Sequence, residues 1–140
     1  MFKLNVLTPE KKAVFDEVIT EVTVPAYSGE MTILPGHASM ITTLGTGILK
    51  YKVPGRDKIF KAMISWGYCE VIGDSVNVLA EFMQLPEEIS VEKYEASLKV
   101  AENKLVTQVL SDADYEQTVN EVDKAHVAID LVKQPEFAKH

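Results

Sequence analysis

The spacing of the apolar residues changes once along this 140-residue chain, at Leu85-Pro86. Before that point apolar and polar residues alternate in short runs, as in residues 2–6 and 18–24, and turn residues separate the runs. After it the apolar residues recur every three or four positions, the spacing of one helix face. The sequence therefore predicts an α+β chain, with an N-terminal antiparallel β-sandwich over residues 1–86 and a C-terminal antiparallel two-helix hairpin over residues 87–140.

Each predicted helix carries one narrow apolar stripe. Ser90 is the candidate N-cap of the first helix, and the stripe that follows consists of Val91, Tyr94, Leu98, Ala101 and Leu105. The second helix is expected to begin at Asp112–Asp114 and to end before Pro135. Its stripe consists of Tyr115, Val119, Val122, Ala125, Ile129 and Val132. Because stripes this narrow leave little apolar surface for the sandwich, we expect the hairpin to be detachable and mobile.

Charge is distributed unevenly between the two predicted parts. Residues 1–86 carry eight Lys or Arg and nine Asp or Glu, whereas residues 87–140 carry six Lys and twelve Asp or Glu, a net charge of −6. Nothing in this distribution forms a cationic stripe that could neutralise phosphates, so nucleic-acid binding is not expected. The amino terminus lacks a signal-peptide pattern, and no apolar run approaches the roughly 20 residues that span a bilayer. We expect a cytoplasmic protein.

Residues 29–40, GEMTILPGHASM, hold Glu30 and His37 between glycines, which raises the question of a catalytic or metal site. No nucleophile elbow, second histidine or metal-ligand spacing accompanies the two side chains. A loop histidine that hydrogen-bonds locally or to a partner is the preferred interpretation, and neither a cofactor nor a metal is expected. A free-standing β-sandwich that binds a ligand or a metal through Glu30 and His37 stays open as the alternative.

Three further candidates are interpreted as structural. His126 has no second ligand at i+4 and is predicted to lie half-buried in the seam between the helices. Cys69, the single cysteine, excludes a disulfide framework and is predicted to be a buried thiol. The DADYE segment from Asp112 begins like a calcium loop but lacks the glycine needed at the sixth position, so helix capping by Asp112 or Asp114 is expected instead.

The run from Gly29 to Ala38, GEMTILPGHA, closely resembles the GE-x-G-I-L-P-G-H-A signature of the epsilon subunit of bacterial rotary ATP synthases, whose mitochondrial counterpart is called delta. The resemblance covers the whole chain. It includes SWGYCEV at residues 65–71, where the family usually has S-G-G-x-L-E-V, and VNVLA at residues 76–80, similar to V-T-V-L-A. It implies a non-catalytic subunit of the central stalk, peripheral on the cytoplasmic face of the cell membrane, that couples rotation of the c ring to the catalytic head.

The resemblance also implies which residues meet which partner. Contact with the polar loops of the c ring is implied for Ser28, Gly29, Glu30 and Met31. Contact with the gamma subunit is implied for His37, Ala38, Ser39 and Met40. The membrane itself is met only indirectly, through the complex.

The predicted hairpin departs from the family. Members that bind ATP carry I/L-D-x-x-R-A at the start of the first helix, whereas the aligned positions here hold Ile89, Ser90, Lys93 and Tyr94. No arginine follows Arg56, so a bidentate phosphate clamp is absent and ATP binding by the hairpin is not expected. The family's hairpin can also meet the alpha and beta subunits of the catalytic head and inhibit ATP hydrolysis. The net charge of −6 is expected to weaken that contact.

Overall fold

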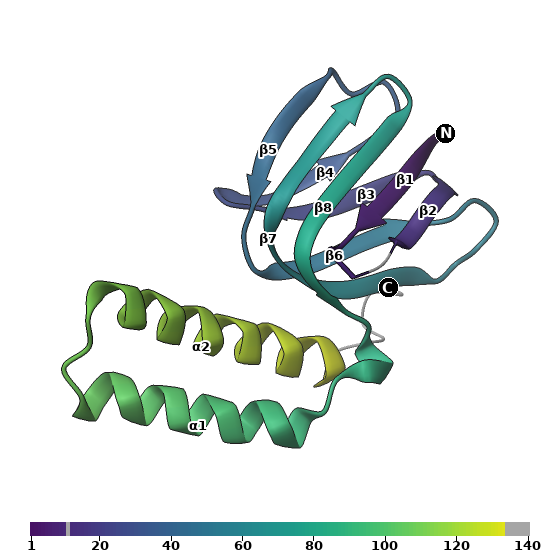
Figure 1. The fold of residues 1–140 in the computed structure, drawn as a ribbon. Coiled ribbons are helices and arrows are strands. Elements are labelled where there is room, and N and C mark those ends of the chain that lie inside the picture. Colours follow the sequence, from purple (N-terminus) through teal and green to yellow (C-terminus); the bar gives the residue numbers. More distant parts are fainter. Residues whose placement is uncertain (11, 134–140) are drawn as a thin grey trace.

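The computed structural model describes residues 1–10 and 12–133, which form a sandwich of strands followed by two helices (Figure 1). The elements are β1 (Phe2–Leu7), β2 (Lys12–Ile19), β3 (Glu21–Ala26), β4 (Gly29–Ile33), β5 (Met40–Leu44), β6 (Gly47–Lys52), β7 (Ile59–Ile72), β8 (Ser75–Gln84), the 3-10 turn η1 (Pro86–Glu88), α1 (Val91–Thr107) and α2 (Asp112–Lys133). The predicted fold class is confirmed. Strands β1 and β8 pair in parallel, and the other paired strands are antiparallel.

The long strand β7 belongs to both layers of the sandwich. Its first half pairs with β6, which continues through β3 to the edge strand β4. Its second half pairs with β5 on one side and with β8 on the other, and β8 leads through β1 to the edge strand β2. The two halves meet at Trp66 and Gly67, which have φ angles of +56° and +152°. A Cβ atom at Gly67 would collide with the carbonyl oxygen of Leu79, so only glycine fits there.

Between the layers lies one continuous apolar core. Its buried members come from all eight strands, and include Leu4, Val6, Ile19, Val22, Val24, Ile33, Leu44, Leu49, Ile64, Cys69, Val71, Val76 and Val78. The prediction of a buried thiol at Cys69 is confirmed. Burial, with a smaller contribution from the Glu70 carboxylate, raises the pKa of the thiol to about 11, so Cys69 stays protonated and unreactive at neutral pH.

The prediction of one alternating strand over residues 18–24 is wrong. The chain bends at Thr20, which separates β2 from β3. The backbone N–H of Thr20 donates to the carbonyl oxygen of Lys52 at 2.9 Å, so the bend is held by a strand distant in sequence. Without glycine, proline, asparagine or aspartate at the bend, the local sequence carries no turn signal.

The two helices form the predicted antiparallel hairpin (Figure 1). Ser90 is the N-cap of α1, as predicted, since its side chain accepts a hydrogen bond from the Lys93 backbone N–H at 3.4 Å. Capping of α2 by Asp112 or Asp114 is wrong. The Ser111 hydroxyl instead accepts a hydrogen bond from the Asp114 backbone N–H at 3.2 Å. The two aspartates lie in the first turn of α2, where their negative charge interacts favourably with the helix dipole.

Helix α2 packs against two neighbours rather than one. Its buried residues are Thr118, Ala125, Ala128 and Leu131. Ala128 and Leu131 contact Met63 of β7 in a second, smaller apolar cluster, which joins the hairpin to the sandwich. Tyr115, predicted in the helix seam, is 55% exposed, and His126 is exposed rather than half-buried, so both predictions are wrong. The prediction of one apolar stripe on α2 failed because it did not include the second face, with which α2 packs against the sandwich.

Replacement of Gly67 by alanine should destabilise the chain by about 2–4 kcal/mol, because the new Cβ meets a strand backbone that cannot move without breaking the β7–β8 pairing. Urea unfolding followed by circular dichroism measures the change. Gly45→Ala is the matched control, since a Cβ at Gly45 meets nothing within 4 Å and should have little effect. Equal stability of the two variants would contradict the packing described for Gly67.

Candidate functional site

The first predicted contact segment is the tip of the β3–β4 hairpin. Ala26 pairs with Gly29, so Tyr27 and Ser28 form a two-residue turn, and both are exposed together with Gly29 and Glu30. The Glu30 carboxylate is 61% exposed and lies 3.5 Å from the Lys50 Nζ atom of β6. Met31 differs from the others because its side chain packs against the core. The tip therefore offers one carboxylate and exposed turn backbone.

The second predicted contact segment, residues 37–40, follows a tight turn. The His37 N–H donates to the Leu34 carbonyl oxygen at 3.1 Å across Pro35 and Gly36, and Gly36 has a φ of +87°. The His37 Nδ1 atom donates to the Ala38 carbonyl oxygen at 2.8 Å. Ala38 and Ser39 are exposed, while Met40 starts β5 and packs partly against the core. The His37 ring is thus engaged in a local hydrogen bond.

The structure does not bring Glu30 and His37 together. Glu30 stands near the start of β4, and His37 lies beyond its other end. Each makes a separate contact, Glu30 with Lys50 and His37 with Ala38. Among residues 1–10 and 12–133, no group of three or more His, Cys, Asp or Glu side chains could hold a metal ion. Two separate contact surfaces fit this geometry better than one chemical site does.

A cavity of about 940 Å³ lies elsewhere, between β2, the β6–β7 hairpin, η1 and the end of α2. It is lined by Tyr51 and Phe60, whose rings stack with centroids 5.2 Å apart, and by apolar residues such as Val14, Met83 and Leu131. Burial raises the pKa of the Tyr51 hydroxyl, and the negative charge of the Glu17 carboxylate adds a smaller increase. Neither Glu30 nor His37 lines this cavity.

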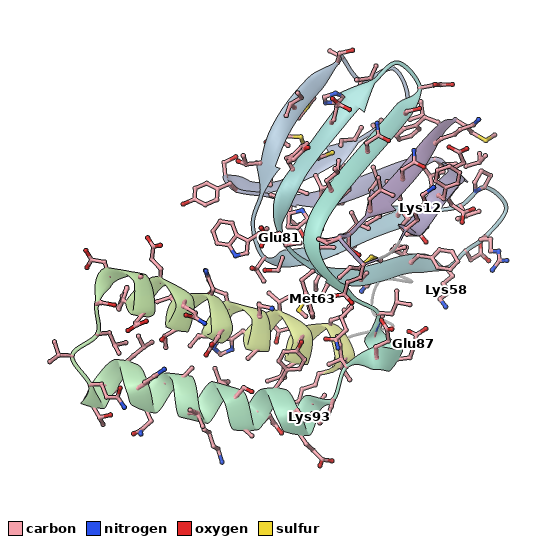
Figure 2. The ribbon with its side chains drawn as sticks, viewed as in Figure 1. Lys12, Lys58, Met63, Glu81, Glu87 and Lys93 are labelled. Atoms are coloured by element: carbon pink, nitrogen blue, oxygen red, sulfur yellow. The ribbon has the colours of Figure 1, made fainter. Side chains whose placement is uncertain are left out.

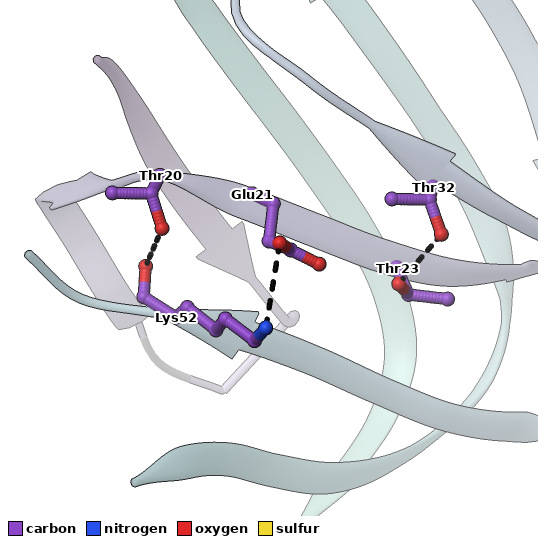
Figure 3. Close-up of polar contacts among 5 residues, drawn as sticks. All are labelled: Thr20, Glu21, Thr23, Thr32 and Lys52. Atoms are coloured by element: carbon purple, nitrogen blue, oxygen red, sulfur yellow. Dashed lines mark hydrogen bonds and ion pairs between the residues drawn. The ribbon is translucent and has the colours of Figure 1, made fainter. Parts of the chain in front are cut away.

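The outer surface of the β4–β3–β6 layer is polar. In Figure 3, Lys52 Nζ lies 3.5 Å from a carboxylate oxygen of Glu21, and the Thr23 and Thr32 hydroxyls are 2.9 Å apart. The Thr20 hydroxyl donates to the Lys52 carbonyl oxygen at 3.5 Å in the same view. With Glu30 and Lys50 nearby, this surface satisfies its charges internally.

The outer surface of the other layer has the opposite character, and the sequence analysis missed it. On β5 and β7 the large apolar side chains that remain exposed are Ile41 (68%), Trp66 (40%), Tyr68 (43%) and Ile72 (54%), and we call this set the outer β7 face. Register pairs Ile41 with Glu70 and Thr43 with Tyr68, so Ile41 lies diagonal to Tyr68 and Ile72, while Trp66 lies two residues before Tyr68 at the bend of β7. The available signal was the SWGYCEVI segment, where apolar residues occupy both alternating positions of one strand.

The positions of the ATP motif are mostly engaged in joining the hairpin to the sandwich. Ile89 packs in the second apolar cluster, Ser90 caps α1, and the Tyr94 hydroxyl donates to the Gln84 side-chain oxygen at 2.6 Å. Lys93 is exposed and points away from the sandwich (Figure 2). Among the described residues, no helix is long and apolar enough to cross a membrane.

Comparison with known proteins starts from the sandwich. Residues 1–86 match the family model described as the ATP synthase delta/epsilon chain, beta-sandwich domain. The ATP synthase epsilon chain of Bdellovibrio bacteriovorus is 42% identical over 132 residues, which cover 94% of both chains. The epsilon chain of Geobacter sulfurreducens is 40% identical over 113 residues, covering 81% of this chain and 80% of its own.

Solved structures show the same fold at low sequence identity. A chain of the Euglena gracilis mitochondrial ATP synthase superposes with a TM-score of 0.71 at 24% identity, covering 99% of this chain and 81% of that chain. A chain of the Tetrahymena thermophila mitochondrial ATP synthase central stalk and c ring gives a TM-score of 0.69 at 12% identity, covering 93% and 95%. On the strength of the family model and the epsilon-chain relatives, this chain belongs to the delta/epsilon family of ATP synthase subunits.

Proposed function

We propose that this non-catalytic, central-stalk subunit of the rotary ATP synthase couples c-ring rotation to the catalytic head through two separate contacts, one with the c ring and one with gamma. The family membership carries the general assignment. The separation of Glu30 and His37 at the two ends of β4 supports two partners rather than one active site. In the assembled complex the subunit is peripheral, on the cytoplasmic face of the cell membrane.

The tip of the β3–β4 hairpin is proposed to face the polar loops of the c ring. Ser28, Gly29 and Glu30 supply the exposed part, and Met31 fixes the strand against the core. Glu30 already has Lys50 at 3.5 Å, so a basic or amide group of the ring must share the carboxylate with that lysine. A contact of this exposed, shared kind is weak by itself and serves orientation more than affinity.

Residues 37–40 are proposed to face gamma. The type II turn at Pro35-Gly36 fixes the direction in which the segment leaves β4. The hydrogen bond from His37 to Ala38 orders the imidazole, and the side chains of Ala38 and Ser39 are exposed. A pre-ordered surface loses less conformational entropy when a partner binds.

Residues 1–86 and 87–140 are proposed to act as two units, of which residues 134–140 lie outside the described part. The joint between them consists of the small cluster around Met63 and Leu131, the Tyr94–Gln84 hydrogen bond and the Lys124 ammonium, which lies 4.0 Å from the Phe82 ring centroid. This joint is much smaller than the core of the sandwich. The hairpin can therefore open at a lower free energy than the sandwich unfolds.

A tagged full-length chain should co-purify gamma, alpha and beta subunits from gently solubilised membranes of the source organism at low ionic strength. Mass spectrometry of the eluate identifies the subunits. Recovery of the chain alone, with a stoichiometric metal ion whose chelation unfolds it, would instead support the free-standing sandwich that uses Glu30 and His37.

Glu30→Lys should weaken attachment of the gamma-containing head to ring-containing membranes and lower ATP-driven ion uptake into vesicles. The reversed charge faces the ring and also repels Lys50. Glu21→Lys is the matched control, because Glu21 has an equivalent 3.5 Å ion pair with Lys52 but lies at the start of β3, away from the tip. Each substitution should change the stability of the isolated chain by less than about 1 kcal/mol. Equal uptake by both variants would contradict the ring assignment.

Leu131→Ala should loosen the hairpin by removing the largest side chain that α2 places against Met63. The expected result is at least about a tenfold rise in the rate of protease cleavage in the link at residues 85–90, while the sandwich remains folded. Val100→Ala, at a residue of α1 that is 67% exposed, should change nothing. Unfolding of the whole chain in a single step, without faster cleavage of the link, would show that the hairpin is not a separate unit.

A further inference from the structure

The cavity of about 940 Å³ beside the end of α2 has an apolar wall, and neither of the proposed partner segments reaches it. Met83 and Leu131 line it, together with the Tyr51 and Phe60 rings, whose centroids are 5.2 Å apart. We call this space the joint cavity, because Leu131 also belongs to the small apolar cluster that joins the hairpin to the sandwich. An occupant that covers this wall gains free energy if it carries an aromatic or aliphatic side chain.

The described charged residues around the joint cavity balance one another. Three are cationic and three are anionic, namely Lys12, Lys58, Lys61, Asp57, Glu87 and Glu88. The Glu88 carboxylate accepts a hydrogen bond from the Leu85 backbone N–H at 2.8 Å, and the Lys58 ammonium lies 5.2 Å from the Phe60 ring centroid. A lining without net charge offers a polyphosphate no overall attraction. It suits a peptide that carries both signs of charge beside an apolar residue.

The chain itself brings such a peptide to the joint cavity. Leu131 lines the cavity, and the described part of the chain ends two residues later, at Lys133. The sequence continues as Gln-Pro-Glu-Phe-Ala-Lys-His over residues 134–140, with one acidic and one basic residue on either side of a phenylalanine. Phe137 follows Lys133 by four residues, which span up to about 13 Å when extended. Both the composition and the reach of this segment match the cavity.

We propose that residues 134–140 dock in the joint cavity, with the Phe137 ring against the stacked rings of Tyr51 and Phe60. The acidic residue of the segment, Glu136, then lies among the lysines that line the cavity. A segment tethered this close to its site has an effective concentration on the order of millimolar, so it outcompetes the same segment of a second copy. The occupant is therefore part of this chain.

Docking of residues 134–140 gives the hairpin a second attachment to the sandwich. Leu131 packs with Met63 of β7, whereas Phe137 enters the space between β2 and the β6–β7 hairpin. The segment must leave the cavity before the end of α2 can move away, so it acts as a latch. The docking concerns this chain alone, whereas the effect on hairpin opening rests on the proposed division into two units.

A cysteine in the cavity wall measures the docking. Ala13 lines the joint cavity and is partly buried, so Ala13→Cys places a thiol there with little change in volume. The Cys69 thiol does not compete, because it is buried and its pKa is raised to about 11. In the full-length chain at neutral pH, maleimide labelling of Ala13→Cys should become at least about tenfold faster when Phe137→Ala is added, and less so with Phe137→Leu.

Two controls accompany this comparison. Tyr115→Ala removes an aromatic side chain that is 55% exposed at the other end of α2, and should leave the labelling of Ala13→Cys unchanged. Thr43→Cys places a thiol at an exposed position of β5, and its labelling should not depend on Phe137. Circular dichroism and cooperative thermal unfolding verify that each variant is folded.

The latch has a separate measurement. Phe137→Ala should raise the rate of protease cleavage in the link at residues 85–90 by at least about threefold, because the hairpin loses one of its two attachments. Unchanged cleavage of the link in Phe137→Ala, alongside faster cleavage in Leu131→Ala, would overturn the latch. Unchanged cleavage in both variants would contradict the division into two units, and the labelling of Ala13→Cys would still decide whether the segment docks.

The labelling experiment also separates the possible occupants. Equal labelling of Ala13→Cys with and without Phe137 would overturn the docking and leave the proposed function intact. Protection that survives Phe137→Ala and fades on dilution would assign the joint cavity to a second copy. Protection that is lost after unfolding, dialysis and refolding of the full-length chain would assign it to a co-purified small molecule, and either result would overturn the proposal.

Discussion

The close approach of Gly67 to the Leu79 carbonyl oxygen is the constraint on which the sandwich depends. At this point β7 passes from the β6 side of the fold to the β5 side without leaving its pairing with β8. One strand thereby joins both layers, and the core lies between them. The same bend turns Trp66 outward, so the element that holds the fold together also creates its most unusual surface.

The hairpin is held by contacts of a different scale. Three buried residues, Met63, Ala128 and Leu131, form the centre of the joint, and partly buried neighbours such as Ile89 and Tyr94 surround it. Ile89, Ser90 and Tyr94 occupy the positions where the resemblance places an ATP motif. In this chain they pack, cap and hydrogen-bond instead. The beginning of α1 thus gives structural support to the docked hairpin, which explains how the chain can retain this arrangement without the motif's aspartate and arginine.

The sequence predicted the elements whose information is local. Alternation in β1, the Ser90 cap and the end of α2 before Pro135 all depend on residues near one another in the chain. The bend at Thr20 depends on a hydrogen bond to Lys52, and the second contact face of α2 depends on Met63. The spacing of apolar residues along the chain does not reveal such partners, because they lie far away in the sequence. The contact segments at residues 28–31 and 37–40 were predicted from the resemblance, and the structure shows that each contains exposed residues and that β4 separates them.

The two outer surfaces of the sandwich have unequal capacity for binding. On the polar surface, Glu30 and Glu21 already have lysine partners at 3.5 Å, and exposed ion pairs of this kind contribute about 0–1 kcal/mol each. A partner that competes for them gains little net free energy. On the outer β7 face Ile41, Trp66 and Tyr68 are 68%, 40% and 43% exposed, so covering them removes apolar area from water at about 25 cal/mol per Å². The apolar face therefore has the greater capacity to gain free energy when a partner covers it, whereas the ion-paired polar surface has little.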